Sequence, residues 1–349
     1  MRSPTRVARG AVLAVRLDSD GDVLLAGPAV RALAASSDTV DLLVSPAGAA
    51  AARLLPAVRQ VLVFDAPWTG YRPPPVSIPG VQRLITDLAG RRYDGAVIFT
   101  SFHQSPLPMA LVARLAGIPA IAASSVDYPG SLLDVRHTRP DGHEVRAALA
   151  LAVAAGGALP AGDDGRLAVR PVLPDCSALV PAGRYIVVHP GASVPARALD
   201  PTHAAAIVAE LARRGRAVVL TGSAVERNIC APAARRASVD LSGGTTLAEL
   251  AAVLAGADCV VVGNTGPAHL AAAVRTPVVS LFSPVVPARW WAPYGVPSIV
   301  LGNRSAACRN SRARECPVPG HPCLTSVRPG EVADAVERLA SGVPEVVPA

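Results

Sequence analysis

The strongest constraint on the fold is a regular alternation between short β-branched segments and longer stretches rich in alanine and leucine. Segments such as Ala11–Arg16 and Thr39–Val44 are short and apolar, and each lies next to a stretch with helical composition. Nearly continuous apolar strands that alternate with helices are typical of a parallel sheet covered by helices on both faces. The sequence therefore predicts an α/β protein with doubly wound sheets.

The alternation is interrupted once, and the interruption divides the chain into two halves. Residues 159–184 contain four prolines, several glycines and no periodic apolar pattern, which is the composition of a linker. A chain of 349 residues is also longer than a single hydrophobic core usually supports. We predict an N-terminal domain of residues 1–178, a second domain of residues 179–329, and a last helix within 330–341.

The basic residues exclude two large enzyme classes. The chain contains no lysine, so all 33 basic residues are arginine. A Walker A loop and a pyridoxal Schiff base both require lysine. The net charge of +7 suits phosphorylated substrates or an anionic membrane face. Because only 3% of residues are aromatic and no basic segment is interleaved with aromatics, we expect no nucleic-acid partner.

The cysteines and the apolar segments indicate the cellular compartment of the protein. Six cysteines are scattered along it, no secretory signal is evident, and no apolar stretch is long enough to cross a bilayer. We expect a cytoplasmic protein, for which peripheral contact with the membrane face stays open. Cys308, Cys316, His321 and Cys323 supply four soft ligands, but their spacing does not match a zinc knuckle. Reduced loop cysteines are the favoured interpretation, and metal binding there is left open.

The first candidate site follows the first predicted strand. Gly21 allows a tight turn, and Asp22 stands where a helix begins. Asp22 fits equally well as an N-cap of that helix and as a general base at the carboxyl end of the strand. Asp18 and Asp20 also form the D-x-D pattern with which some transferases hold a divalent ion. We favour a site without metal.

Three strand-to-helix turns in the second half are candidates for holding a phosphorylated ligand. Their small residues let backbone amides approach an oxyanion, and Arg197 adds a charged donor. Glu226 stands where a carboxylate can accept hydrogen bonds from the two hydroxyls of a ribose. As ordinary turns they need no ligand, with Asn264 or Thr265 capping a helix and His269 in the core. The residues of these turns are His189, Gly191, Ser193, Arg197, Gly222, Ser223, Glu226, Asn264, Thr265, Gly266 and His269.

Taken in order, these segments resemble those of glycosyltransferase family 9, the ADP-heptose heptosyltransferases of lipopolysaccharide core synthesis. The resemblance covers nearly the whole chain and rests on 16–25 with Pro28, on 189–193, on 221–223 with Glu226, and on 264–272. It implies a GT-B fold of two Rossmann-like domains facing a cleft. The first domain would bind the acceptor and the second the donor. The last helix, 330–341, would cross back to the first domain.

The resemblance also implies a reaction, namely inverting and metal-independent transfer of a heptose from ADP-heptose to a glycan or glycolipid acceptor. Asp22 matches the catalytic carboxylate of the family, which would deprotonate the acceptor hydroxyl. Arg197 falls near the lysine that meets the donor diphosphate, and Thr265 with Gly266 matches the phosphate-binding turn. Glu226 falls near the acid that binds the ribose. No cofactor is implied.

The acceptor side departs from the family pattern. Where the family often has an Asp-Leu-Gln turn, this chain has Thr100-Ser-Phe-His103-Gln104. We predict acceptor contacts from Gly21, His103, Gln104 and Arg136. A glycolipid, a wall glycan or a secondary metabolite then competes with lipopolysaccharide as the acceptor, and another nucleotide-sugar competes as the donor. Two further alternatives share the architecture: a nucleotide-sugar 2-epimerase, which needs no acceptor, and a nucleotide-sugar-binding protein without transferase activity.

Overall fold

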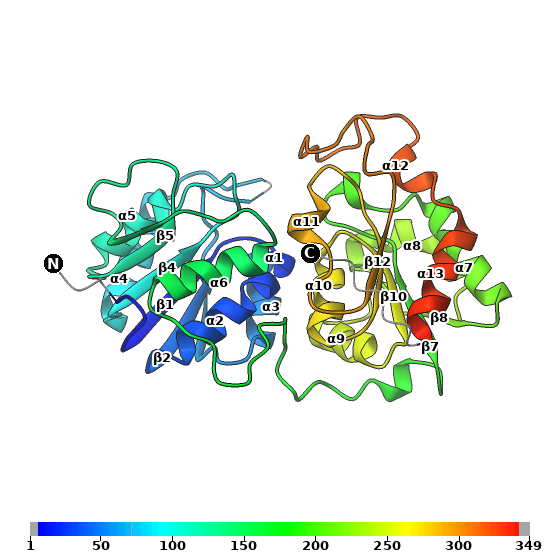
Figure 1. Cartoon of the computed structure of the whole chain (residues 1–349), viewed down its shortest axis with the longest axis horizontal. Helices are drawn as coiled ribbons and strands as arrows, with labels where there is room; N and C mark the ends of the chain where they lie inside the picture. Colours follow the sequence, from blue (N-terminus) through cyan, green and yellow to red (C-terminus); the bar gives the residue numbers. More distant parts are fainter. Residues whose placement is uncertain (1–5, 71, 342–349) are drawn as a thin grey trace. The chain divides into compact units, whose positions relative to one another are not determined.

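The computed structural model describes residues 6–70 and 72–341, and the chain divides into two compact units between Val169 and Arg170. The division falls inside the segment 159–184 that the composition marks as a linker. Within the described residues each unit has one six-stranded sheet, and every pair of neighbouring strands runs parallel (Figure 1). The predicted doubly wound α/β architecture is confirmed.

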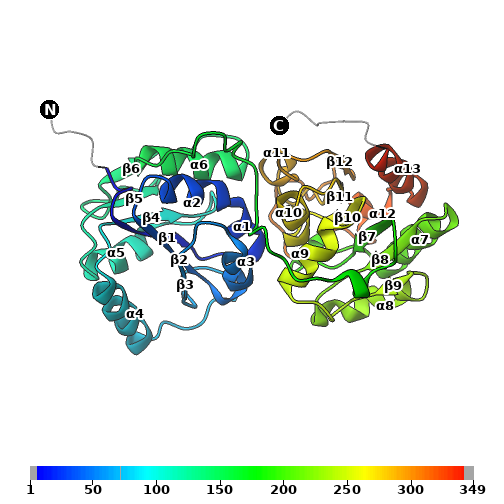
Figure 2. The same ribbon diagram turned by 90° about the horizontal axis from the view of Figure 1, so that it is seen from below.

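The sheet of the first unit has the strand order β3-β2-β1-β4-β5-β6. Its strands are β1 (Ala11–Arg16), β2 (Thr39–Val44), β3 (Gln60–Val63), β4 (Gly95–Phe99), β5 (Ile121–Ser124) and β6 (Val135–His137). Its α-helices are α1 (Asp20–Leu25), α2 (Gly27–Ala34), α3 (Ala49–Leu54), α4 (Ile78–Arg91), α5 (Leu107–Leu115) and α6 (Glu144–Ala154). Helices α2 and α6 cover one face of this sheet, and α4 and α5 cover the other (Figure 2).

The single helix predicted to begin at Asp22 is two helices in the structure. Helix α1 ends at Leu25 and α2 begins at Gly27, with Pro28 in its first turn. Proline lacks the backbone N–H that a continuous helix would need there, whereas a first turn leaves that position without an internal partner. Helix α1 is thereby a short element of its own, directly after β1.

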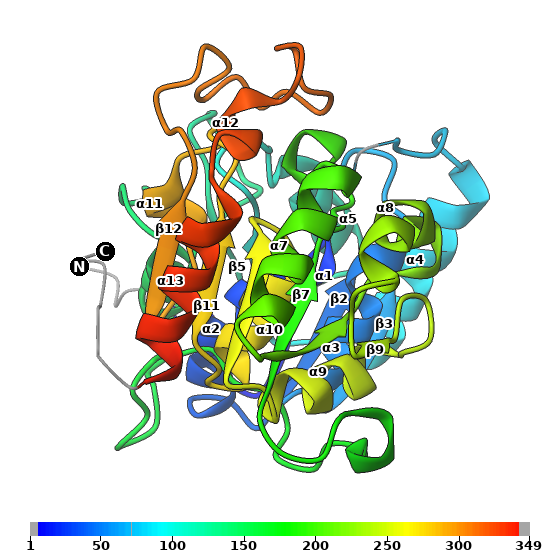
Figure 3. The same cartoon turned by 90° about the vertical axis from the view of Figure 1, so that its right-hand side faces the viewer.

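The sheet of the second unit has the order β12-β11-β10-β7-β8-β9. Its strands are β7 (Tyr185–His189), β8 (Ala217–Leu220), β9 (Val239–Asp240), β10 (Cys259–Gly263), β11 (Val278–Leu281) and β12 (Ser298–Leu301). Its α-helices are α7 (Pro201–Arg213), α8 (Arg227–Ala234), α9 (Leu247–Ala255), α10 (Gly266–Ala273), α11 (Ala288–Trp291), α12 (Pro322–Thr325) and α13 (Pro329–Ala340). Helices α7 and α13 lie side by side on one face of this sheet (Figure 3).

The last helix packs within the second unit, where α13 contacts α7, β10, β11 and β12. That it also crosses back to the first domain stays a prediction. Val332, Val336 and Leu339 are buried in the same hydrophobic cluster as Ile186 of β7 and Ile207 of α7. The apolar face of α13 is therefore buried in the core of the second unit.

Both sheets reverse their strand order beside the first strand of the unit, between β1 and β4 in one and between β7 and β10 in the other. In open α/β sheets, ligands bind outside the carboxyl ends of the strands at such a reversal. The candidate motifs of the sequence follow β1, β4, β7, β8 and β10, so the fold places them at these two edges.

Candidate functional site

A buried arginine organises the carboxyl edge of the first sheet. Arg16 is the last residue of β1 and is only 2% exposed. Its guanidinium lies 2.9 Å from Oδ2 of Asp18, donates to Oδ1 of Asp22 at 3.1 Å, and donates to Oγ of Ser101 at 3.0 Å. Burial acts to lower the pKa of Arg16, but the carboxylates of Asp18 and Asp22 outweigh it and raise the pKa. One permanent cation therefore holds two carboxylates in fixed positions.

Asp22, the predicted catalytic residue, keeps part of its carboxylate in contact with solvent. Helix α1 begins at Asp20 with Ser19 as its N-cap, so Asp22 lies in the first turn and is not the cap itself. Its Oδ1 accepts from Arg16, and its Oδ2 accepts from the hydroxyl of Ser19 at 3.0 Å. The side chain of Asp22 is 24% exposed. A carboxylate that is oriented by two donors and open on one side has the geometry that a general base requires.

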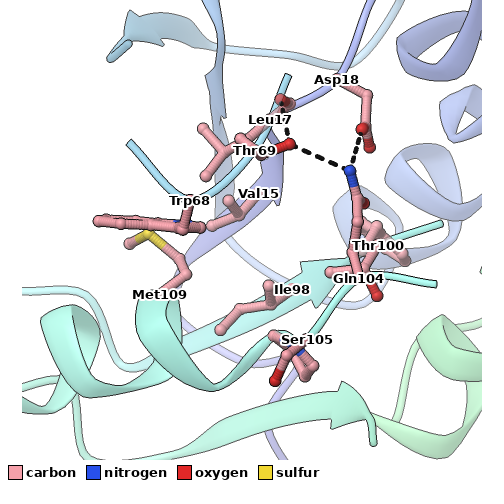
Figure 4. Close-up of a pocket in the computed structure, with 12 residues that line it drawn as sticks. Val15, Leu17, Asp18, Trp68, Thr69, Ile98, Thr100, Gln104, Ser105 and Met109 are labelled. Atoms are coloured by element: carbon pink, nitrogen blue, oxygen red, sulfur yellow. Dashed lines mark hydrogen bonds between the residues drawn. The ribbon is translucent and has the colours of Figure 1, made fainter. Parts of the chain in front are cut away.

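Asp18 and Gln104 lie together beside a pocket at the ends of β1 and β4 (Figure 4). Nε2 of Gln104 donates to Oδ1 of Asp18 at 2.6 Å and to Oγ1 of Thr69 at 3.0 Å. Oε1 of Gln104 accepts from the backbone N–H of Ser101 at 2.9 Å. Burial raises the pKa of Asp18, although Arg16 and the hydrogen bond from Gln104 oppose the rise. The predicted acceptor residue Gln104 is thus brought next to the Arg16 cluster.

The other predicted acceptor residues lie outside this cluster or serve the backbone. Gly21 is buried in the first turn of α1. His103 is exposed in the turn after β4, where its ring makes an edge contact with Phe102 at 5.1 Å between centroids. Arg136 on β6 donates to the carbonyl oxygens of Ser125 and Val126 at 3.1 and 2.7 Å. Arg136 therefore braces the loop after β5.

Sequence reasoning missed a second buried carboxylate near Arg16. Glu144 opens α6, is 2% exposed, and accepts a hydrogen bond of 2.5 Å from Arg139. Burial raises the pKa of Glu144, against the opposing effects of Arg16 and Arg139. The sequence offered one signal, an acidic residue at the start of a helix, and the helix dipole explains that signal equally well.

In the second unit, the turns after β7 and β8 meet around one carboxylate. His189 ends β7, is buried, and has its Nδ1 3.0 Å from Oγ1 of Thr221. Its Nε2 lies 3.7 Å from Oε2 of Glu226. The same Oε2 accepts from the backbone N–H and the hydroxyl of Ser223, both at 2.7 Å. Burial lowers the pKa of His189, although Glu226 opposes it, so the imidazole is neutral at pH 7.

Two glycines of these turns are required by close packing. A Cβ at Gly191 would lie 2.3 Å from the carboxyl carbon of Glu226, and a Cβ at Gly222 would lie 2.7 Å from Sγ of Cys230. The backbone after β7 therefore lies directly against the Glu226 carboxylate. Ser193, further along the same turn, is exposed. The predicted residues that come together are His189, Gly191, Gly222, Ser223 and Glu226.

The turn after β10 lies on the opposite side of β7 from the turn after β8. A Cβ at Gly263 would lie 2.7 Å from the carbonyl oxygen of Arg197, so the short helix Pro195–Arg197 packs on the end of β10. The Asn264 side chain accepts from the backbone N–H of Ser283 at 3.0 Å and donates to its carbonyl oxygen at 3.3 Å. Asn264 is therefore a clamp between two loops and does not cap α10.

Helix α10 begins immediately after this clamp. Thr265 is the N-cap and makes no side-chain cap hydrogen bond, and Gly266 is the first helical residue. His269 is 5% exposed, one turn into the helix. The helix N-terminus thus presents backbone N–H groups and a positive dipole end beside the turn that carries Arg197. Such an arrangement suits a phosphate group.

The residues considered as metal ligands are engaged otherwise. Both oxygens of Asp18 face Arg16 and Gln104, and Oδ1 of Asp20 accepts from the backbone of Ala51 at 2.8 Å. Within the described ranges, no three His, Cys, Asp or Glu side chains are arranged to hold a metal ion. Burial, followed by the nearby thiol of Cys308, raises the pKa of Cys323 to about 11. All six cysteines are free thiols.

Comparison with known proteins agrees with this geometry. The model of the family described as glycosyltransferase family 9 (heptosyltransferase) matches residues 81–321, which is more than half of the chain. No curated protein sequence matches. A glycosyl transferase family 9 structure from Veillonella parvula DSM 2008 is similar, with a TM-score of 0.74 and 15% identity over 95% of this chain and 97% of that one.

Two Escherichia coli structures are similar over 95% of this chain and 98% of theirs. ADP-heptose lps heptosyltransferase II has a TM-score of 0.71 with 20% identity, and heptosyltransferase WaaC with ADP has a TM-score of 0.64 with 22% identity. These likenesses confirm the predicted GT-B fold. Among the helices of the described residues, none combines the length and apolar character that crossing a membrane requires.

The Arg16 cluster yields a stability prediction. Replacing Arg16 with methionine leaves two carboxylates at a buried edge without their cation, and breaking a buried ion pair costs about 3–5 kcal/mol. We expect Arg16→Met to lower the urea concentration at which the first unit unfolds, measured by circular dichroism. The matched control is Arg213→Met, which removes an exposed partner of Glu210 and should leave the midpoint nearly unchanged. Equal midpoints for both variants would refute the structural role of Arg16.

The buried histidine yields a prediction about pH. The pKa of His189 is lowered in the folded state, so the unfolded chain binds more protons as the pH falls below about 6.5. The free energy of unfolding should therefore be largest above that pH and decrease below it. His189→Gln removes this contribution, and its thermal midpoint should depend less on pH between about 6.5 and 4.5 than that of the unsubstituted protein. An unchanged pH dependence would contradict the burial argument.

Proposed function

The chain belongs to glycosyltransferase family 9, and we propose that it transfers a heptose from ADP-heptose to a hydroxyl of a glycan or glycolipid. The transfer inverts the anomeric configuration and uses no metal. In this proposal the first unit binds the acceptor and the second unit binds the donor. A lipopolysaccharide core is the acceptor type that the family resemblance supports.

The observation that carries the proposal is the orientation of Asp22. Its carboxylate is fixed by Arg16 and Ser19 and remains partly open to solvent at the carboxyl end of β1. In the reaction the acceptor hydroxyl loses its proton to Asp22 as its oxygen attacks the anomeric carbon. The bond between that carbon and the phosphate oxygen of ADP breaks on the opposite side, which inverts the configuration.

The turns of the second unit support ADP as the leaving group. The N-terminus of α10 at Gly266, together with Arg197, supplies positive charge and N–H donors for the developing charge on the diphosphate. The carboxylate of Glu226 is held by Ser223, with its Oε2 facing His189, and is the candidate partner of the ribose hydroxyls. These groups provide the stabilisation that a divalent cation supplies in other transferases.

The chemistry of the chain also supports a cytoplasmic location with peripheral contact at the membrane face. Six free thiols suit a reducing compartment, and the net charge of +7 suits an anionic lipid surface.

Donor identity is tested first by thermal unfolding in EDTA with ADP, UDP, GDP, NAD and ADP-heptose. A ligand at about a hundred times its dissociation constant adds about 2.7 kcal/mol to the free energy of unfolding, which appears as a higher midpoint. We expect ADP to stabilise the protein and ADP-heptose to stabilise it more. A higher midpoint with UDP or GDP in place of ADP would identify a different donor nucleotide. An unchanged midpoint with all five ligands would refute the proposed donor site.

The role of Asp22 is tested by Asp22→Asn. Loss of a general base costs about 10²–10⁴-fold in turnover, while the donor site in the second unit is untouched. We therefore expect ADP release from ADP-heptose to collapse and stabilisation by ADP to persist. The assay uses the best acceptor from a panel of simple glycosides and heptose-deficient lipopolysaccharide.

The control variant is Asp20→Asn, two residues earlier in the same turn. Its amide oxygen can still accept from the backbone of Ala51, so activity should stay near that of the unsubstituted protein. Full activity in Asp22→Asn would refute the proposed base. Donor turnover that needs no acceptor and yields an altered sugar would indicate the epimerase alternative.

A further inference from the structure

The pocket beside Asp18 is not lined by the candidate base Asp22, although Arg16 contacts both carboxylates. It lies wholly within the first unit, between the ends of β1 and β4 and the turn that carries Trp68 and Thr69. In Figure 4 the indole of Trp68 lies next to Met109, while the carboxylate of Asp18 and the amide of Gln104 lie on the opposite side. One wall is thus apolar and aromatic, and the other is polar.

The pocket lining carries a negative charge and no positive charge. Among the side chains that line the pocket, Asp18 is the only ionisable one, and no arginine or histidine contributes to the wall. The nearest cation, Arg16, is shared between Asp18 and Asp22, so these three groups together carry one net negative charge. An anionic ligand group would therefore meet repulsion here, whereas a hydroxyl can donate to a carboxylate oxygen.

The size of the pocket limits what can enter it. Its cavity volume of about 20 Å³ suits a small substituent such as a hydroxyl or a hydroxymethyl group. A whole sugar ring does not fit inside, so the ring would lie at the mouth with one substituent inserted. Trp68 at the apolar wall is half-buried and offers the kind of surface on which the C–H face of a sugar packs.

We propose that this pocket selects the acceptor by taking an uncharged hydroxyl or hydroxymethyl substituent of its sugar ring, with Trp68 against the ring. Asp18, positioned by Gln104 and Arg16, accepts a hydrogen bond from the inserted hydroxyl and excludes a carboxylate at that position. The acceptor residue is accordingly a neutral sugar and not a uronic or other acidic sugar. The inference rests on the proposed function, because it assigns the acceptor of that same reaction.

The test uses pairs of methyl glycosides that differ only at one substituent. The methyl glycosides of glucose, mannose and galactose carry a hydroxymethyl group where their uronate counterparts carry a carboxylate. Saturation-transfer NMR on the full chain detects such weak ligands. We expect at least one neutral glycoside to bind about tenfold or more tightly than its uronate, because a like charge at a buried site costs this much or more.

Variants separate the two walls of the pocket. Trp68→Ala should abolish the signal of the neutral glycoside, whereas Trp291→Ala in the second unit should preserve it. Asp18→Asn should narrow the preference over the uronate, because it removes the repelling charge. Thr69→Val serves where Asp18→Asn does not fold, and it should weaken the neutral glycoside by disturbing Gln104.

Three results would overturn the inference: equal binding of both members of every pair, no binding of any neutral glycoside, or unchanged binding by Trp68→Ala. Thermal stabilisation by ADP, measured on the same sample, keeps the two proposals apart. A protein that responds to ADP but shows one of these results refutes the neutral-acceptor pocket alone. A protein that does not respond to ADP refutes the proposed use of ADP-heptose as the donor.

Discussion

The first unit depends on one buried guanidinium. Arg16 stands at the end of a strand that is otherwise apolar, where an unpaired charge would be very unfavourable. Its planar fork reaches Asp18, Asp22 and Ser101 at once, which a lysine ammonium at the end of a flexible stem would not hold in one geometry. Arg16 thus positions both the candidate base Asp22 and Asp18 in the wall of the proposed acceptor pocket. A substitution at one of these two carboxylates is expected to affect the position of the other.

In the second unit, the main constraint is the close packing of the turns that follow β7, β8 and β10. Strand β7 is central, so its loop must pack against the loops of β8 and β10 at the same time. Gly191 makes room for the carboxylate of Glu226, and Gly263 makes room for the carbonyl oxygen of Arg197. Neither glycine has a positive φ, so close packing accounts for both positions and backbone strain does not. Asn264 then ties the β10 loop to the next one.

Sequence reasoning succeeded where a signal is local and failed where it depends on tertiary packing. Strands β1 and β2 are mostly apolar, and their bounds were predicted to the residue. The edge strands β6, β9 and β12 were missed because they are two to four residues long and partly exposed, which leaves too few apolar positions to form a pattern. The amphipathic stripe of α13 was visible, but amphipathicity says only that a face is buried and does not identify its partner.

The same distinction applies to the site. Asp22, His189 and Gly266 follow strands in small-residue turns, and that position is readable from the sequence. Trp68 and Thr69 belong to a loop with no motif, and they reach the pocket only because β1, β4 and the chain after β3 converge in space. The residues proposed to bind the donor could therefore be predicted from short motifs, while those proposed to select the acceptor could be identified only from the fold. In this chain the fold places a net negative charge and an aromatic wall around the pocket beside Asp18. This local charge argues for a neutral acceptor even though the whole molecule is basic.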